Sequence, residues 1–218
     1  MLREIDLNEI SDGKKYRHCD MVRTDSCGCV GCFTCCQNMG TSIVLDPMDI
    51  WQLTKAVEKS PSELFDTALE LNWVDGLILP NLKMSGDSNT CIFLNEEGRC
   101  SVHNYRPGIC RMFPLGRYYE KRSFSYFLQV HECPQNKSKI KVDKWLGIPN
   151  IKKYETYISD WHYFLKDVEK ALNEYGQGER KQMSLYLLRQ FYFSPYPVEA
   201  FYETFWQRLD ETKRMFLD

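Results

Sequence analysis

The sequence contains no apolar run of the roughly 18 or more residues that a membrane-spanning helix requires. Its first segment, MLREIDLNEISDGKKYRH, has neither an apolar stretch nor a small-residue cleavage site, so we expect no secretory signal. We therefore expect no membrane partner and a cytoplasmic location, a compartment in which thiols stay reduced.

A strong net charge is also lacking. The 28 lysines and arginines nearly balance the 30 aspartates and glutamates, which gives a formal charge of −2 at pH 7. Basic and aromatic residues are interleaved between Arg111 and Arg122, a pattern that would suit a nucleic-acid patch if taken alone. Because the whole chain is slightly acidic, we expect no nucleic-acid partner.

The sequence has no internal repeat and none of the common catalytic motifs, neither G-x-G-x-x-G nor G-x-S-x-G nor H-E-x-x-H nor a P-loop. Glu96, Glu97, His131 and Glu132 are ionisable residues close to cysteines, and the first two are explained as turn residues. Catalytic residues are therefore unknown from the sequence, and it stays open whether the chain is an enzyme.

Cysteine is the residue that the chain has in excess. It has ten cysteines, and five of them fall in the stretch CGCVGCFTCC, from Cys27 to Cys36. A disulfide framework fits poorly, because the compartment is reducing and because neighbours such as Cys35 and Cys36 point opposite ways on an extended chain. The pattern therefore predicts metal chelation.

The predicted metal ligands form two groups of four along the sequence. They are Cys29, Cys32, Cys35 and Cys36, and then Cys91, Cys100, Cys110 and Cys133. Eight thiolates match two tetrathiolate centres, or one centre with spare ligands. The C-x-x-C-x-x-C spacing favours an iron–sulfur cluster, whereas zinc sites more often use two separated C-x-x-C pairs, so iron is preferred and zinc is the alternative.

Several residues near the cysteines have roles that the sequence leaves open. Cys19, Cys27, His103 and His131 are further candidate ligands. A thiolate centre is anionic and is stabilised by donors around it, so we predict that Arg106 and Arg111, on either side of Cys110, contribute to binding the cofactor. A solvated basic face is the alternative interpretation of these arginines.

Local patterns predict an α+β fold, with a small cysteine-rich core of short strands packed against helices and a C-terminal helical bundle. The predicted strands cover residues 43–45, 77–84 and 123–130, and a hairpin joins 91–94 to 99–103. Asp46 and Ser60 are expected to cap helices, the second of which would run to about residue 71. An apolar stripe from Ile151 to Tyr175 predicts a long amphipathic helix, followed by two more helices.

We divide the chain into three parts on this basis. Residues 1–26 form a polar N-terminal extension that wraps loosely, residues 27–141 form the metal-binding region, and residues 142–218 form a helical region packed on the same domain. No cysteine occurs after Cys133, which separates the second part from the third.

The chain resembles the CxxCxxCC family, whose domain is described as zinc- or iron-chelating. The segments that carry this resemblance are CVGCFTCC and CIFLNEEGRCSVHNYRPGICRMFP, and the similarity spans roughly residues 27 to 135. It matches Cys91, Phe93, Leu94, Gly98, Cys100, Val102, His103, Arg106, Pro107, Cys110, Arg111, Phe113 and Pro114. Flagellin lysine-N-methylases carry a similar cysteine motif.

The function predicted from the sequence is metal chelation through clustered cysteines, with the reaction unassigned. The metal is iron, as an iron–sulfur cluster, or zinc. The alternatives are a relative or component of a protein-modifying enzyme such as a lysine N-methylase, and a structural zinc protein that acts in protein interaction. The predicted partners are accordingly a metal ion or cluster and a protein.

Overall fold

The computed structural model describes residues 6–25, 32–86, 89–133 and 138–217, and these residues form an α+β fold as predicted. The α-helices are α1 (Leu7–Ile10), α2 (Pro47–Val57), α3 (Pro61–Thr67), α4 (Gly108–Met112), α5 (Val142–Leu146), α6 (Ile151–Ala171), α7 (Gln177–Leu187) and α8 (Phe201–Phe216). Two 3-10 turns, η2 (Thr34–Cys36) and η3 (His103–Tyr105), and a π-helical segment, η4 (Leu188–Phe193), join them. No helix in the described part is long and apolar enough to cross a membrane.

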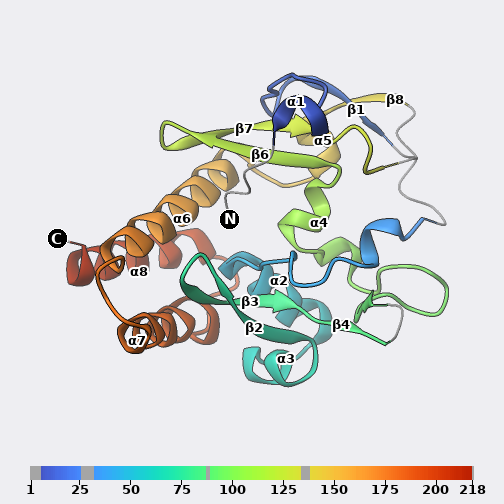
Figure 1. The fold of residues 1–218 in the computed structure, drawn as a ribbon. Helices are drawn as coiled ribbons and strands as arrows, with labels where there is room; N and C mark the ends of the chain where they lie inside the picture. Colours follow the sequence, from blue (N-terminus) through green and yellow to red (C-terminus); the bar gives the residue numbers. More distant parts are fainter. Residues whose placement is uncertain (1–5, 26–31, 87–88, 134–137, 218) are drawn as a thin grey trace.

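The strands pair only in twos within the described ranges. They are β1 (Met21–Asp25), β2 (Leu69–Val74), β3 (Leu77–Leu82), β4 (Met84–Ser85), β5 (Thr90–Cys91), β6 (Leu115–Glu120), β7 (Ser123–Leu128) and β8 (Ser138–Lys141). The antiparallel pairs are β1–β8, β2–β3, β4–β5 and β6–β7. Figure 1 shows the β6–β7 hairpin, β1, β8 and α5 together at the top, β2, β3, α2 and α3 at the bottom, and α4 between these two parts.

Both predicted helix starts are confirmed. Asp46 accepts a hydrogen bond from the backbone N–H of Asp49, and the Asp49 side chain accepts one in return from the N–H of Asp46. Ser60 and Glu63 form the same reciprocal capping box at the start of α3. Each box satisfies two N–H groups that a helix otherwise leaves unpaired, and Pro follows each cap at a position that needs no N–H donor.

The predicted end of the second helix is wrong. Helix α3 stops at Thr67, and residues 69–74 form strand β2 instead. Asp75 and Gly76 turn the chain into β3, both with positive φ (49° and 79°), which is the conformation of a two-residue hairpin turn. The Asp-Gly pair was the sequence signal for this hairpin, and strand pairing overrides the helical pattern of the residues before it.

Two other predicted strand assignments need correction. Residues 43–45 make a single bridge, between Val44 and Asn81, rather than a strand. The expected hairpin of residues 91–103 is also reduced to one bridge, between Leu94 and Cys100, because Cys91 pairs with Met84 in β5–β4. The strand expected at residues 123–130 is confirmed as β7, paired with β6.

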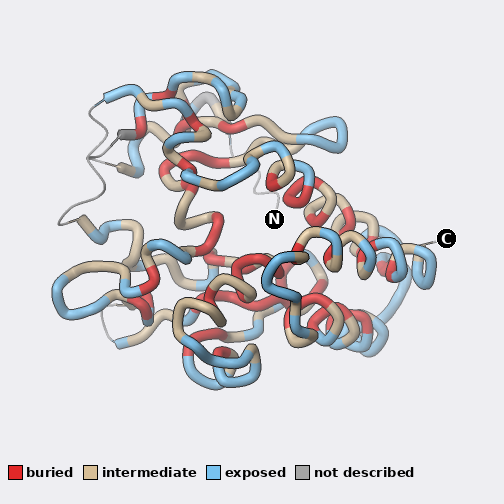
Figure 2. The backbone as a smooth tube through the Cα atoms, turned by 180° about the vertical axis from the view of Figure 1, so that it is seen from behind, coloured by how far each residue is buried: buried red, intermediate tan, exposed pale blue. Residues whose placement is uncertain are grey.

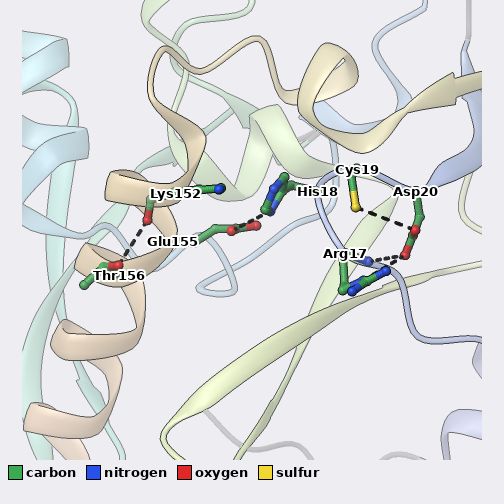
Figure 3. A network of polar contacts seen from close by, with 7 residues as sticks. All are labelled: Arg17, His18, Cys19, Asp20, Lys152, Glu155 and Thr156. Carbon is green, nitrogen blue, oxygen red and sulfur yellow. Dashed lines mark hydrogen bonds and ion pairs between the residues drawn. The ribbon is translucent and has the colours of Figure 1, made fainter.

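The N-terminal segment does not wrap loosely in its described part. Met21 and Val22 pair with Lys141 and Ile140. Strand β1 therefore pairs with β8, a strand that follows Cys133, the last cysteine in the sequence. Val22 is buried in a small apolar cluster, whose other members are Met112, Leu115, Tyr126, Leu128, Val142 and Leu146. His18 adds a hydrogen bond between its Nδ1 and the Glu155 carboxyl of α6, at 2.9 Å, which Figure 3 shows from close by.

The main core lies where the C-terminal helices meet α2 and the β2–β3 hairpin. Figure 2 shows buried residues along the inner sides of these helices. Tyr157, Phe191 and Phe205 are fully buried, and the rings of Tyr157 and Phe205 meet edge to face at 4.6 Å between centroids. Most of the predicted apolar stripe therefore packs into this core, as expected for an amphipathic helix. The helix ends at Ala171, however, and Tyr175, the last residue of the predicted stripe, is exposed.

His162 joins α6 to the β6–β7 hairpin. Its ring stacks on Tyr119 with centroids 3.5 Å apart and an interplanar angle of 8°. Burial first, and then nearby positive charges that include Lys166 and Arg117, lower the pKa of His162 from 6.5 to about 4. The folded chain therefore binds fewer protons than the unfolded chain between these two values, so acidification from pH 7 toward pH 4 destabilises it.

We expect His162→Phe to reduce this acid sensitivity. Phenylalanine keeps a flat ring against Tyr119 but cannot be protonated. Between pH 7 and pH 5 the wild type should lose about 1 kcal/mol more unfolding free energy than the variant, after allowance for the partial exposure of the histidine. Urea denaturation at both pH values measures the difference, and equal losses in the two proteins would contradict the assignment.

Candidate metal centre

The cysteine-rich segments converge on one cavity of about 90 Å³. Seven of the eight predicted ligands line it, namely Cys32, Cys35, Cys36, Cys91, Cys100, Cys110 and Cys133. The eighth, Cys29, lies outside the described residues, as does Cys27. The volume is several times the ~10–15 Å³ that one water molecule needs, so it has room for a metal ion or a small cluster.

Backbone contacts bring the first cysteine segment to the second. Gln37, next to η2, forms a bridge with Thr90, and the Asn38 N–H donates to the carbonyl of Asn89 at 2.9 Å. Thr90 immediately precedes Cys91, so the two sulfur-bearing segments lie side by side.

Gly98 provides a second contact between these segments. It has a φ of 70°, and a Cβ atom at this position would lie 2.9 Å from the ring of Phe33. Glycine is therefore required both by the backbone conformation and by the close approach of this ring. The ring holds the 91–100 loop against the segment that carries Cys32 and Cys35.

Cys110 reaches the cavity through α4, which is anchored to α2. The Asp49 carboxylate accepts a hydrogen bond from the Gly108 N–H at 2.7 Å, in addition to the one from Asp46 N–H. Asp49 is buried, with 6% of its surface exposed. The capping box of α2 thus also sets the start of the short helix that presents Cys110.

The cavity environment favours the protonated form of four thiols. Burial is the main cause of the raised pKa values of Cys91, Cys100 and Cys110. The pKa of Cys35 is raised first by a hydrogen bond with Cys36, then by burial and by the charge of Cys36. Metal binding requires thiolates, so occupation of this site would release protons.

These four thiols also influence one another. Negative charge at Cys91, Cys35 and Cys100 raises the pKa of Cys110, after the effect of burial. Charge at Cys35 likewise raises the pKa of Cys91 and of Cys100. The structure therefore mixes the two groups that follow each other in the sequence, because Cys35 lies among the thiols of the second group.

The described thiols share a cavity without forming a finished coordination sphere. Among the residues that the structure describes, no group of three or more His, Cys, Asp or Glu side chains is arranged to hold a metal ion. The observations that bear on a metal centre are thus the shared cavity, its thiol chemistry and the mutual effects on pKa.

The two predicted arginines have different surroundings. Arg106 lines the thiol cavity, and its charge lowers the pKa of Cys35 and of Cys100, against the larger effects that raise them. Its Nη1 contacts the ring of His103, while its buried Nε has no hydrogen-bond partner in the described part of the chain. Arg111 does not line this cavity within the described ranges; it donates to the carbonyls of Leu146 and Asn104.

The further candidate ligands differ in whether they line the thiol cavity. His103 lines the cavity, and burial, followed by the charges of Arg106, Arg99 and Arg111, lowers its pKa. Cys19 is exposed and faces Asp20, 3.8 Å away, in the segment shown in Figure 3. Neither Cys19 nor His131 belongs to the described lining of the thiol cavity.

The sequence did not predict the apolar wall of the cavity. Phe33, Phe93 and Phe113 line it together with Trp145 of α5. Trp145 donates its indole N–H to the carbonyl of Met112, which attaches α5 to the end of α4. Phe93 and Phe113 belong to the motif that carries the family resemblance, but no local signal relates Trp145 to cysteines far earlier in the chain.

Comparison with known families agrees with this site. Residues 28–139 match the model of the family "CxxCxxCC: Putative zinc- or iron-chelating domain", so the chain belongs to the CxxCxxCC family. The match supports chelation of a metal in general. No curated protein and no solved structure matches the chain.

Proposed function

We propose that the protein holds an iron–sulfur centre, with Cys35, Cys91, Cys100 and Cys110 as its principal ligands. The observation that carries the proposal is that these four buried or half-buried thiols share one cavity, in which charge at Cys35 raises the pKa of each of the other three. Cys36 is within hydrogen-bond range of Cys35 and is the next candidate. Cys32 and Cys133 line the same cavity, and Cys29 is retained from the sequence pattern.

The surroundings support an anionic centre of this kind. Arg106 places a guanidinium beside the thiols, and its buried, unpaired Nε–H can donate to a cluster sulfur or a thiolate. The lining also contains apolar aromatic side chains, and an apolar environment strengthens such interactions. When bound, the cluster would supply electron-transfer chemistry, and the protein would set its potential through these contacts.

The choice of iron over zinc rests on the C-x-x-C-x-x-C spacing, since thiolates bind both metals. With zinc the centre would be structural, holding loops together that have little regular structure of their own. In that case the function of the protein would be to bind a protein partner through its surface.

Metal analysis and an absorption spectrum of protein purified without oxygen test the proposal. We expect brown protein that absorbs at about 400 nm, with about four irons and matching sulfide for each cubane cluster. Stoichiometric zinc in a colourless protein would overturn the iron assignment and leave chelation in place. Protein without stoichiometric metal, even after anaerobic reconstitution with either metal, would overturn chelation itself.

A further inference from the structure

A second cavity, of about 310 Å³, meets the thiol cavity at Arg106. It lies between α2, η3, α4 and the turn of residues 147–149 that leads into α6. Arg106 is the one described residue that lines both cavities, and no described cysteine lines the second. Its volume is at the lower end of the range of small-molecule sites, about 300–1,000 Å³.

Three cations line this cavity: Lys55, Arg106 and Arg111. Within the described ranges, none of the three forms an ion pair with a carboxylate. The one acidic residue in the lining is Asp49, whose two oxygens already accept the N–H groups of Asp46 and Gly108. Three cations thus face one carboxyl group, whose pKa is raised to about 8 by burial and then by the charge of Asp46, so the described side chains leave the cavity with an excess of positive charge.

The cations still have donors to offer. Arg111 uses Nη1 and Nη2 once each, toward the carbonyls of Leu146 and Asn104, out of the five N–H groups of a guanidinium. The Nζ atom of Lys55 lies 3.2 Å from the centroid of the Trp51 ring, which packs against Phe201 with ring centroids 4.9 Å apart and an interplanar angle of 37°. Burial lowers the pKa of Lys55, so this ammonium is partly desolvated without a carboxylate beside it.

We propose that this cavity binds a small-molecule anion that carries phosphate groups. Two guanidinium forks and one ammonium around a concave site match an anion with more than one negative charge, and arginine and lysine are the residues that recognise phosphate. Past the turn of residues 147–149, Lys144 and Lys152 line an adjoining hollow together with Asp143. The proposal does not depend on which metal the thiols bind.

Calorimetric titration of the full chain, with its metal as purified, tests this site with pyrophosphate as the probe. All titrations are run at one ionic strength, because salt screens exposed charges. Lys55→Met removes the ammonium and keeps most of the side-chain length. Lys59→Met is the matched control, since Lys59 is exposed, lies just past the end of α2 and is outside the cavity lining.

We expect pyrophosphate to bind the wild type and Lys59→Met equally, and Lys55→Met at least about tenfold more weakly, the effect of losing roughly 1.4 kcal/mol. Arg111→Met should also weaken binding. This substitution removes hydrogen bonds to two backbone carbonyls and can therefore disturb folding. If Arg111→Met misfolds, the result for Lys55→Met decides the test. The metal content of every sample is measured before and after titration, because pyrophosphate can also coordinate metal.

Three results would overturn the proposal. The first is no detectable binding to the wild type, and the second is equal binding to Lys55→Met and the wild type. The third is binding of citrate that depends on Lys55, with none of pyrophosphate, which would make the ligand a carboxylate. Loss of pyrophosphate binding in Lys55→Met with full metal content would separate this site from the metal centre.

Discussion

Replacing Cys110 with serine is expected to release most of the bound metal. Cys110 is the thiol on which the charges of Cys35, Cys91 and Cys100 all act, so it lies at the centre of the proposed ligand set. Serine keeps the size of the side chain but provides no thiolate. Because ligand binding contributes directly to folding, the variant should also melt at a lower temperature and give less folded protein.

Metal content per chain and thermal melting measure this effect against Cys19→Ser. Cys19 is exposed and does not line the described cavity, so its variant should keep the metal content and stability of the wild type. Wild-type metal content in Cys110→Ser would remove this residue from the ligand set. Equal losses in both variants would show that the chain is sensitive to any thiol change, not to this site.

Replacing Asp49 with alanine is expected to lower the free energy of unfolding by about 2–4 kcal/mol. The substitution leaves the N–H groups of Asp46 and Gly108 without their acceptor, and one of these bonds is a helix cap while the other is buried. Because Gly108 begins the helix that carries Cys110, metal should also dissociate more readily. Asp49→Asn can still accept from Gly108 and should be milder.

Chemical denaturation and the rate of metal loss to a chelator measure the two effects. Asp66→Ala is the matched control, since Asp66 is an exposed aspartate in the neighbouring helix α3 and its loss should change stability by less than about 0.5 kcal/mol. If Asp49→Ala unfolds more easily but loses metal at the wild-type rate, then the contact with Gly108 does not position Cys110.

Helix starts could be predicted from sequence because their signals are local. Asp46 with Pro47, and Ser60 with Pro61 and Glu63, carry everything that a capped helix start needs within a few residues, and both boxes form. The stripe of α6 is likewise a local pattern over many turns. Helix ends and short strands were predicted less well, as residues 69–74 and 91–103 show.

Those failures share one cause. Cys91 pairs with Met84, and Leu71 pairs with Pro80, so each assignment depends on a partner strand that the local pattern does not contain. The N-terminal strand depends on an even more distant partner, since Met21 pairs with Lys141. Propensity is a weak guide where pairing and burial decide the structure.

The sequence by itself determined the chemistry of the site. Ten cysteines, the C-x-x-C-x-x-C-C run and the downstream motif were enough to predict chelation and membership of the CxxCxxCC family. Spacing along the chain suggested two separate groups of ligands. The division into two groups rested only on the order of the cysteines along the chain, since thiols that are close in sequence can reach one another through a short loop.

Only the tertiary structure decided which thiols meet. The Gln37–Thr90 bridge, the Phe33–Gly98 contact and the hydrogen bond from Gly108 to Asp49 bring three distant segments to one cavity and place Cys35 with thiols of the second group. It also distinguished Arg106, which lines both the thiol cavity and the neighbouring cationic cavity, from Arg111, which lines only the cationic cavity among the described residues. Residue type and spacing are properties of the chain, whereas the position of each side chain depends on contacts between segments that lie far apart in sequence.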